Sequence, residues 1–314
     1  MFKILLQHPI HTLDGKELVP AGVTLTQEVV REVIASNTGR TTKRMSLMQF
    51  GSVKSDISQF FVSPPYREIF DNPVETGAAI DVSEDVLNVM EQVTLPVPVL
   101  DALAYFREYD FHTYRHMLMV FALSSLLAKM LVPDYQRRID HAKAGPSHDL
   151  GKICVPLDIL MKVNPLSREE RNILFQHSIA GYVLLCYHTG DLEDFSAKAA
   201  RDHHERREGS GYMRGVKLND PMVEIIAVSD VYDALISPRP FRPESFDNRT
   251  ALEEVTFMAQ RGQISWEVVQ ALISLNRKDK PYFGSLKVAL EKRGTSPQEN
   301  NYGKTEAGMK MEQC

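Results

Sequence analysis

The distribution of histidines is the feature of this sequence that most constrains its fold. Eight of the ten histidines lie between His112 and His204, whereas a uniform scatter over the chain would place about three there. Several stand next to an acidic residue, as in the pair His148-Asp149. This clustering needs a cause, and we expect a fold that packs distant segments so that these side chains converge.

Helical patterns fill the chain from about residue 98 to about residue 290. Residues 117–131 form the most apolar stretch, but two serines and a lysine interrupt it, and it is shorter than the roughly 20 residues of a membrane span. We interpret it as a buried helix. A capping box, Ser167 to Glu170, opens another helix that continues in pattern through His177. The sequence therefore predicts a mainly α fold, built as a helical bundle.

The first 95 residues follow a different pattern. Short strand-like pieces at residues 2–6 and 16–19 alternate with Gly and Pro turns. Thr24 to Gln27 has the form of a capping box that would open a helix with apolar residues at helical spacing. We predict a small α+β accessory module over residues 1–95 that senses a signal or binds a partner. We also predict a disordered tail over residues 291–314, which are poor in large apolar side chains.

Charge and cysteine content limit the ligands and the compartment that we expect. A formal net charge of -5 and a pI near 6.1 argue against binding a nucleic-acid polymer through an extended basic face. Three cysteines without a C-x-x-C pair make neither a disulfide framework nor a thiolate zinc site. The apolar run after Lys3 ends at Leu6, which is too short for a signal peptide. We expect a cytoplasmic protein without a membrane span.

The histidines and their acidic partners predict a metal centre. Imidazole nitrogens with a few carboxylates suit Fe, Mn or Zn, and the lack of thiolate ligands favours a catalytic site over a structural zinc site. Five imidazoles and two carboxylates exceed what one ion with an open position would use, so we expect two ions bridged by Asp149. The candidate ligands are His116, His148, Asp149, His177, His203, His204 and Asp230. Asp233, three residues after Asp230, is expected to orient a metal-bound histidine.

Several sequence elements follow one another in a recognisable order. They are His116, His148-Asp149-Leu150-Gly151-Lys152, His177, His203-His204-Glu205, Gly209-Ser210-Gly211-Tyr212, Asp230 to Leu235 and Arg239-Pro240-Phe241-Arg242. This order resembles the HD-GYP family of HD-domain phosphohydrolases. The resemblance implies an all-helical HD-type domain over residues 96–290 with two or three iron ions, for which manganese can substitute. It also implies a role in bacterial signalling, by hydrolysis of cyclic di-GMP to pGpG and onward to GMP.

The resemblance also assigns residues to the substrate. Lys152, one turn after the His148-Asp149 pair, would hold a substrate phosphate, as would Arg239 and Arg242. Cations at these places would stabilise the charge that develops on the phosphate oxygens. Tyr212, in a glycine-rich loop, would offer its ring and hydroxyl to the ligand. Asp149 and Lys152 are the residues that we expect to take a direct part in catalysis.

The chain departs from the family pattern at several positions. Met213 replaces the proline of the GYP signature, Glu208 stands where Asp is usual, and the stretch from Tyr212 to Asp230 is about two residues short. His112 stands where members with three metals carry Glu, which argues against a third metal ion. Pro146 cannot lie in a regular helix, so we expect the chain to be distorted on its approach to His148.

Three functions remain open on the sequence alone. The first is hydrolysis of cyclic di-GMP by a hydroxide that bridges two metal ions. The second is a receptor or scaffold that binds a cyclic dinucleotide without turning it over and that acts through residues 1–95. The third is hydrolysis of another cyclic dinucleotide, which the short segment after Tyr212 would permit. The sequence also leaves open whether the chain forms a homodimer.

Overall fold

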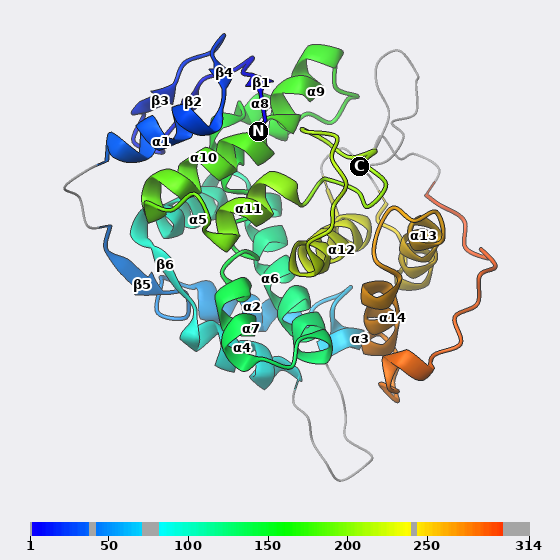
Figure 1. Cartoon of the computed structure of the whole chain (residues 1–314). Coiled ribbons are helices and arrows are strands. Elements are labelled where there is room, and N and C mark those ends of the chain that lie inside the picture. The colour runs from blue at the N-terminus through cyan, green and yellow to red at the C-terminus, as the bar shows by residue number, and fades with distance from the viewer. Residues whose placement is uncertain (1, 38–41, 71–81, 240–243, 298–314) are drawn as a thin grey trace.

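The computed structural model describes residues 2–37, 42–70, 82–239 and 244–297. The helices are α1 (Gln27–Ala35), α2 (Val53–Phe61), α3 (Arg67–Phe70), α4 (Val82–Gln92), α5 (Val97–Tyr109), α6 (Phe111–Leu131), α7 (Tyr135–Ala142), α8 (Leu157–Leu160), α9 (Arg168–Phe175), α10 (His177–Thr189), α11 (Phe195–Asp202), α12 (Pro221–Ile236), α13 (Asn248–Gln260) and α14 (Trp266–Leu275), with 3-10 helices η1 (Leu150–Cys154) and η2 (Phe283–Ser285). The strands are β1 (Ile4–Leu5), β2 (Ile10–His11), β3 (Glu17–Val19), β4 (Thr24–Leu25), β5 (Arg44–Ser46) and β6 (Thr94–Pro96). The mainly α prediction is confirmed (Figure 1).

The strands form three short antiparallel pairs, β1 with β4, β2 with β3, and β5 with β6. Strands β1 to β4 and helix α1 pack at one end of the molecule beside α10, whereas α2 and α4 pack against α6 at the other (Figure 1). The segment before residue 95 therefore contacts the helical bundle at two separate places.

The predicted boundary near residue 95 lies inside a continuous structure. Strand β6 pairs with β5 across that boundary, with Met45 opposite Leu95. One hydrophobic core contains buried side chains from both sides of it, among them Leu6, Ile57 and Leu123. Residues 1–95 thus share their core with the helices that follow. A sensing or partner-binding role for this segment stays a prediction, and the predicted tail lies outside the described residues from position 298 onward.

Helix α6 is the central element of the bundle. Fifteen of its 21 residues are buried, and it packs against α5, α12 and α14. A helix that is apolar on all sides is expected to be surrounded by protein, so the interpretation of residues 117–131 as a buried helix is confirmed. In the described part of the chain, every helix is too short or too polar to cross a membrane.

Two of the predicted helix starts and ends are wrong in detail. The side chain that caps α1 belongs to Thr26, which accepts from the backbone N–H of Val29, whereas Thr24 lies in strand β4. The capping box at Ser167 is present, but its helix α9 ends at Phe175 and a new helix begins at His177. At this break the carbonyl oxygen of Leu174 accepts a hydrogen bond from the His177 ring.

The expected distortion before His148 is present. Helix α7 ends at Ala142, and the backbone then passes through successive turns that contain Pro146. These turns deliver His148 and Asp149 directly to the start of η1. A proline in this place ends the helix because it lacks an N–H and clashes with the preceding turn.

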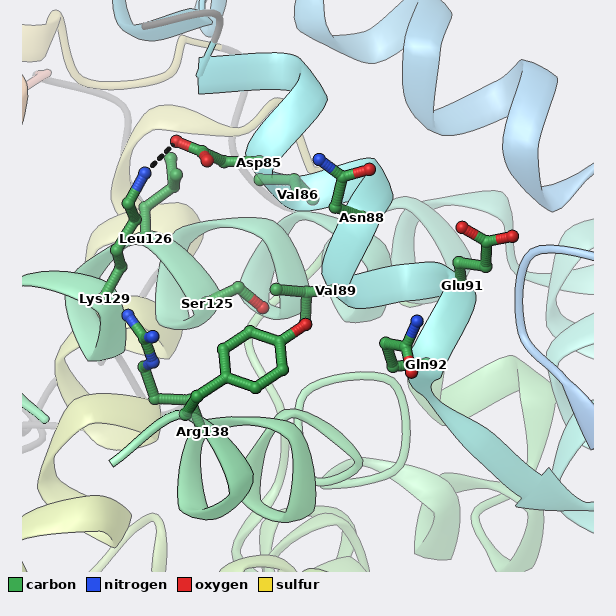
Figure 2. Close-up of a pocket in the computed structure, with 11 residues that line it drawn as sticks. Asp85, Val86, Asn88, Val89, Glu91, Gln92, Ser125, Leu126, Lys129 and Arg138 are labelled. Carbon is green, nitrogen blue, oxygen red and sulfur yellow. Dashed lines mark hydrogen bonds and ion pairs between the residues drawn. The ribbon is translucent and has the colours of Figure 1, made fainter. Parts of the chain in front are cut away.

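A cavity of about 390 Å³ lies where α4 packs on α6 and α7 (Figure 2). Lys129 of α6 pairs with Asp85 of α4 at its edge. Ser125 is the first residue of α6 that lines this cavity, and it lies nine residues after His116. Nine residues correspond to about 13 Å along the helix axis. This cavity is therefore separate from the histidine cluster.

Candidate metal centre

The seven candidate ligands converge from five places in the sequence. His116 comes from the second turn of α6, His148 and Asp149 from the turn before η1, His177 from the first turn of α10, His203 and His204 from the residues directly after α11, and Asp230 from α12. All of them are buried or nearly so, and the most exposed side chain is that of His204, at 12%. The structure thus brings together every residue that the sequence proposed as a ligand. Their role as ligands stays a prediction.

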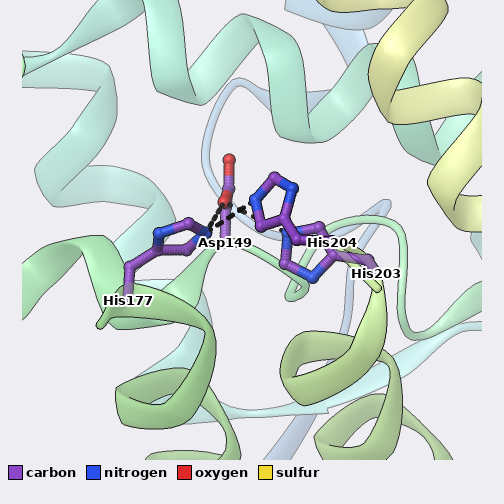
Figure 3. A group of neighbouring side chains, drawn as sticks. All are labelled: Asp149, His177, His203 and His204. Carbon is purple, nitrogen blue, oxygen red and sulfur yellow. Dashed lines mark hydrogen bonds and ion pairs between the residues drawn. The ribbon is translucent and has the colours of Figure 1, made fainter. Parts of the chain in front are cut away.

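Asp149 joins two groups of potential ligands. Its Oδ1 atom lies 3.2 Å from Nε2 of His177 and 3.9 Å from Nε2 of His203. Its Oδ2 atom lies 3.5 Å from Nε2 of both His116 and His148. Figure 3 shows the carboxylate with the rings of the first group, which also includes His204, around it. A carboxylate with one oxygen toward each group can bridge two cations.

Asp230 extends the group that contains His116. Its Oδ1 atom lies 3.0 Å from Nε2 of His116, and its Oδ2 atom lies 3.8 Å from Nδ1 of His204. Asp230 therefore lies between the two groups on the side of α12. With Asp149 it gives the cluster two carboxylates that offset the charge of divalent cations.

Hydrogen bonds fix the orientation of four rings. The Nδ1 atoms of His148, His177 and His203 lie 2.6–2.9 Å from the carbonyl oxygens of Gly145, Leu174 and Ala200. The Nδ1 atom of His116 lies 2.6 Å from Oδ2 of Asp233. A ring that donates from Nδ1 presents the Nε2 lone pair, and metal-bound histidines are held in this way. The expected orienting role of Asp233 agrees with this geometry.

Three buried ring nitrogens lack a hydrogen-bond partner among the described residues. They are Nε2 of His148, Nε2 of His203 and Nδ1 of His204. Buried polar atoms without partners are rare in folded proteins, and each needs an explanation. Here they all face the space around Asp149 and Asp230. Neutral imidazole lone pairs and two carboxylates around one space are the donor set that iron, manganese or zinc prefers, so the residues fit the implied metals.

Burial keeps these imidazoles neutral. It lowers the pKa values of His148 and His204, and it lowers that of His203 to about 3. For Asp149, burial opposes ionisation, but the positive charge of Lys152 outweighs it and holds the pKa well below its ordinary value. Metal ligands must be deprotonated to bind, and these three imidazoles and Asp149 are in that state at neutral pH. Burial also opposes protonation of His116, but its hydrogen bonds with Asp230 and Asp233 outweigh burial and raise its pKa.

A stack of aromatic rings covers His204. The ring of Tyr212 lies parallel to that of Phe175, with centroids 3.9 Å apart, and also stacks on His204, with centroids 4.4 Å apart. Tyr212 therefore lies between these two rings and helps to hold His204. A contact between Tyr212 and substrate stays a prediction.

Two glycines allow backbone segments to approach at the site. A Cβ atom on Gly151 would lie 1.9 Å from the carbonyl oxygen of His177, and a Cβ atom on Gly211 would lie 2.3 Å from that of His204. Glu205, which is fully buried, anchors the second segment by accepting from the backbone N–H groups of Arg214 and Val216. The glycines and Glu205 of the motifs thus have structural roles beside the ligands.

The residues assigned to the substrate differ in their placement. Lys152 is buried, and its Nζ atom lies 2.6 Å from Oδ2 of Asp149. Arg239 reaches the same region, since its Nη2 atom lies 3.4 Å from Nδ1 of His116. Arg242 lies outside the described residues. His112, half-buried one turn before His116, faces the carbonyl of Pro238.

Sequence reasoning missed two residues that support the centre. Tyr66 contacts Asp233 from the segment that the sequence predicted to be an accessory module. Gln176 precedes His177, and its side chain bonds the backbone of Gln7 and His8. Both contacts join residues more than 160 positions apart, and no local pattern in the sequence indicates them.

The cluster and the helical bundle define a class of protein. Residues 101–265 match the family model described as HD domain. The match covers more than half of the chain, and the chain belongs to this family.

Three curated relatives place the resemblance more closely. The chain is 34% identical over 184 residues to a cyclic di-GMP phosphodiesterase of Thermotoga maritima, with 57% of this chain and 49% of the relative covered. It is 31% identical over 239 residues to cyclic di-GMP phosphodiesterase PA4108 of Pseudomonas aeruginosa, with 70% and 55% covered. It is 33% identical over 159 residues to 3'3'-cGAMP-specific phosphodiesterase 1 of Vibrio cholerae, with 50% and 35% covered.

The resemblance that the motifs indicated is confirmed at the level of the family. The chain spans between 35% and 55% of the length of these three relatives.

Proposed function

We propose that this protein is a metal-dependent phosphodiesterase that hydrolyses cyclic di-GMP to pGpG, to GMP or to both. The proposal extends to this chain the activity that the names of its relatives state. The observation that carries it is the placement of Asp149, whose two carboxylate oxygens face two separate groups of imidazoles. A single-metal or purely structural site has no need of that arrangement.

The chain would hold two divalent ions, which we propose to be iron, with manganese as the alternative. His116, His148 and Asp230 would hold one ion, His177, His203 and His204 the other, and Asp149 both. When bound, such a pair acidifies a shared water to a hydroxide that can attack phosphorus.

The protein's own cations would act on the substrate. Arg239 lies at the edge of the cluster, where its guanidinium would neutralise charge on a phosphate oxygen. Lys152 holds Asp149 ionised and oriented, and we propose that it also approaches a phosphate when substrate enters. In hydrolysis the attacking water oxygen forms a new P–O bond while one P–O3' bond breaks, and the departing ribose O3' takes up the proton that the water released.

One experiment tests the proposal directly. Protein purified without oxygen, reduced and loaded with Fe²⁺ or Mn²⁺, is incubated with cyclic di-GMP, and the nucleotides are separated by chromatography. We expect two bound ions per chain and release of pGpG or GMP. Intact substrate with both metal positions filled would reject the proposed hydrolysis. Calorimetry on the same sample then identifies a receptor, because a receptor binds the nucleotide without forming product.

A second substrate also has support. One relative is named as specific for 3'3'-cGAMP, and the loop around Tyr212 departs from the family pattern at Met213. Turnover of 3'3'-cGAMP and cyclic di-GMP under the same conditions decides between the two. A higher kcat/KM for 3'3'-cGAMP than for cyclic di-GMP would identify 3'3'-cGAMP as the substrate.

A further inference from the structure

Tyr66 lies far in sequence from the metal-binding motifs but reaches their centre. It follows α2 in the segment before residue 95, and the residue is only 1% exposed. Its hydroxyl donates to Oδ1 of Asp233 on α12 and lies 2.7 Å from Oγ of Ser237. The other oxygen of Asp233 lies 2.6 Å from Nδ1 of His116. An unbroken series of hydrogen bonds therefore joins Tyr66 to a candidate ligand.

We propose that Tyr66 is a positioning residue of the metal centre, which holds Asp233 so that His116 keeps its Nε2 atom directed at the metal. The proposal rests on the two-metal site described above. It assigns to residues 1–95 a structural part in that site, in addition to any sensing role.

The geometry explains why the hydroxyl is needed. Asp233 is fully buried, so its oxygens must find donors within the protein. The Tyr66 hydroxyl donates to Oδ1 of Asp233, while His116 and Ser237 bond Oδ2. Oγ of Ser237 lies 3.2 Å from Oδ2. Without the hydroxyl, Oδ1 would have to turn toward another donor. That rotation would move Oδ2 away from the His116 ring and release the ring's orientation.

The backbone around Tyr66 holds its side chain in place. Its N–H donates to the carbonyl oxygen of Ser63, and its own carbonyl oxygen accepts from Ile69 and Phe70. The rings of Phe61 and Phe70, which precede and follow Tyr66 in the sequence, stack on each other with centroids 4.2 Å apart. The backbone is thus held on both sides of Tyr66, as an orienting residue requires.

The same N-terminal segment supports the second group of ligands as well. The Oε1 atom of Gln176 accepts from the N–H groups of Gln7 and His8 at 2.8 and 3.1 Å. Its Nε2 atom donates to the carbonyl oxygen of His8 at 2.8 Å. Gln176 immediately precedes His177, so each group of ligands has a neighbour tied to the N-terminal segment.

The test is the Tyr66→Phe variant, with Tyr114→Phe as its matched control. Tyr114 is also fully buried, and its hydroxyl also donates to a carboxylate, that of Asp56, which is not part of the centre. Mn²⁺ is titrated into metal-free protein, and free Mn²⁺ is measured by electron paramagnetic resonance with a competing chelator. We expect one of two ions to bind about 10- to 100-fold more weakly in Tyr66→Phe, and both to bind normally in Tyr114→Phe.

Thermal unfolding of the metal-free proteins separates this effect from general destabilisation. Unchanged Mn²⁺ affinity in Tyr66→Phe, or an equal loss in Tyr114→Phe, would overturn the proposal. If Tyr66→Phe does not fold, Asp233→Asn must weaken the binding of the ion that His116 would hold. The result is independent of turnover: selective loss of one ion in a protein that hydrolyses no cyclic dinucleotide would reject the proposed function and retain the role of Tyr66.

Discussion

Replacing Gly151 by alanine tests whether the approach of η1 to α10 builds the metal centre. A Cβ atom at this position would lie 1.9 Å from the carbonyl oxygen of His177 and 2.4 Å from the backbone nitrogen of Gly181. A carbon and an oxygen need roughly 3.2 Å, so the two backbones must separate by about 1.3 Å. Both atoms that the methyl group meets belong to the backbone, so no side chain can turn aside to relieve the contact.

Two consequences of this displacement can be measured. Overpacking a well-packed site costs about 1–3 kcal/mol, which would appear as a lower free energy of unfolding in urea. A displacement of about 1 Å at His177 greatly exceeds the tolerance of metal–ligand distances, which is about 0.2 Å, and misplacing a reacting group by this much costs roughly 100-fold in rate. We therefore expect Gly151→Ala to lose the ion held by His177 and nearly all turnover.

The matched control is a glycine at the C-terminal end of α10, the helix that Gly151 approaches at its start. Gly190 caps α10 with φ of 74°, and a Cβ atom there would have no neighbour within 4 Å. Gly190→Ala should cost about 1 kcal/mol through backbone strain alone and keep its metals and turnover. If Gly151→Ala bound two ions and turned over substrate like the unmodified protein, the argument from close approach would be wrong.

Three further predictions concern single side chains. Asp149→Ala should remove both metal ions and all activity, because it removes the carboxylate between the two groups, and elemental analysis that finds both ions retained would reject the bridge. Lys152→Ala should keep both ions but lower kcat on the order of 100-fold, whereas unchanged kcat would remove Lys152 from the substrate site. Burial lowers the pKa of His188 to about 4, so the folded state binds fewer protons than the unfolded one, and stability present above pH 6.5 is lost as the pH falls toward 4. That loss is about 2 kcal/mol between pH 7.5 and pH 5. His188→Gln should abolish it in urea titrations at the two pH values, and equal losses in both proteins would contradict the assignment.

The sequence predicted the candidate ligands better than it predicted the ends of the helices. Histidines and aspartates can be recognised from short sequence motifs because their residue type determines whether they can bind a metal. All seven candidate ligands could therefore be named before the structure showed that they converge. The ends of helices depend on small differences in local energy. Thr24 and Thr26 are both capable caps, and the pairing of β1 with β4 decides that Thr26 takes the role. The break at Gln176 likewise depends on contacts with Gln7 and His8, which the helical pattern does not contain.

The histidines show why the nearby sequence determines one part of the site and distant residues determine the rest. His148, His177 and His203 lie in turns or at helix ends, and each bonds a carbonyl oxygen three residues earlier in the chain. Carbonyl groups in a turn or in the last turn of a helix have no α-helical N–H partner four residues later, so they can accept from a side chain. The nearby sequence is therefore enough to orient these three rings.

His116 lies inside α6, where the preceding carbonyl groups are already used by the helix itself. An acceptor for its Nδ1 atom has to come from another element, and here it is Asp233 on α12. A buried carboxylate in turn needs donors of its own, which brings in Tyr66 from a third element. A ligand placed inside a buried helix thus makes the site depend on parts of the chain that no motif around it can specify.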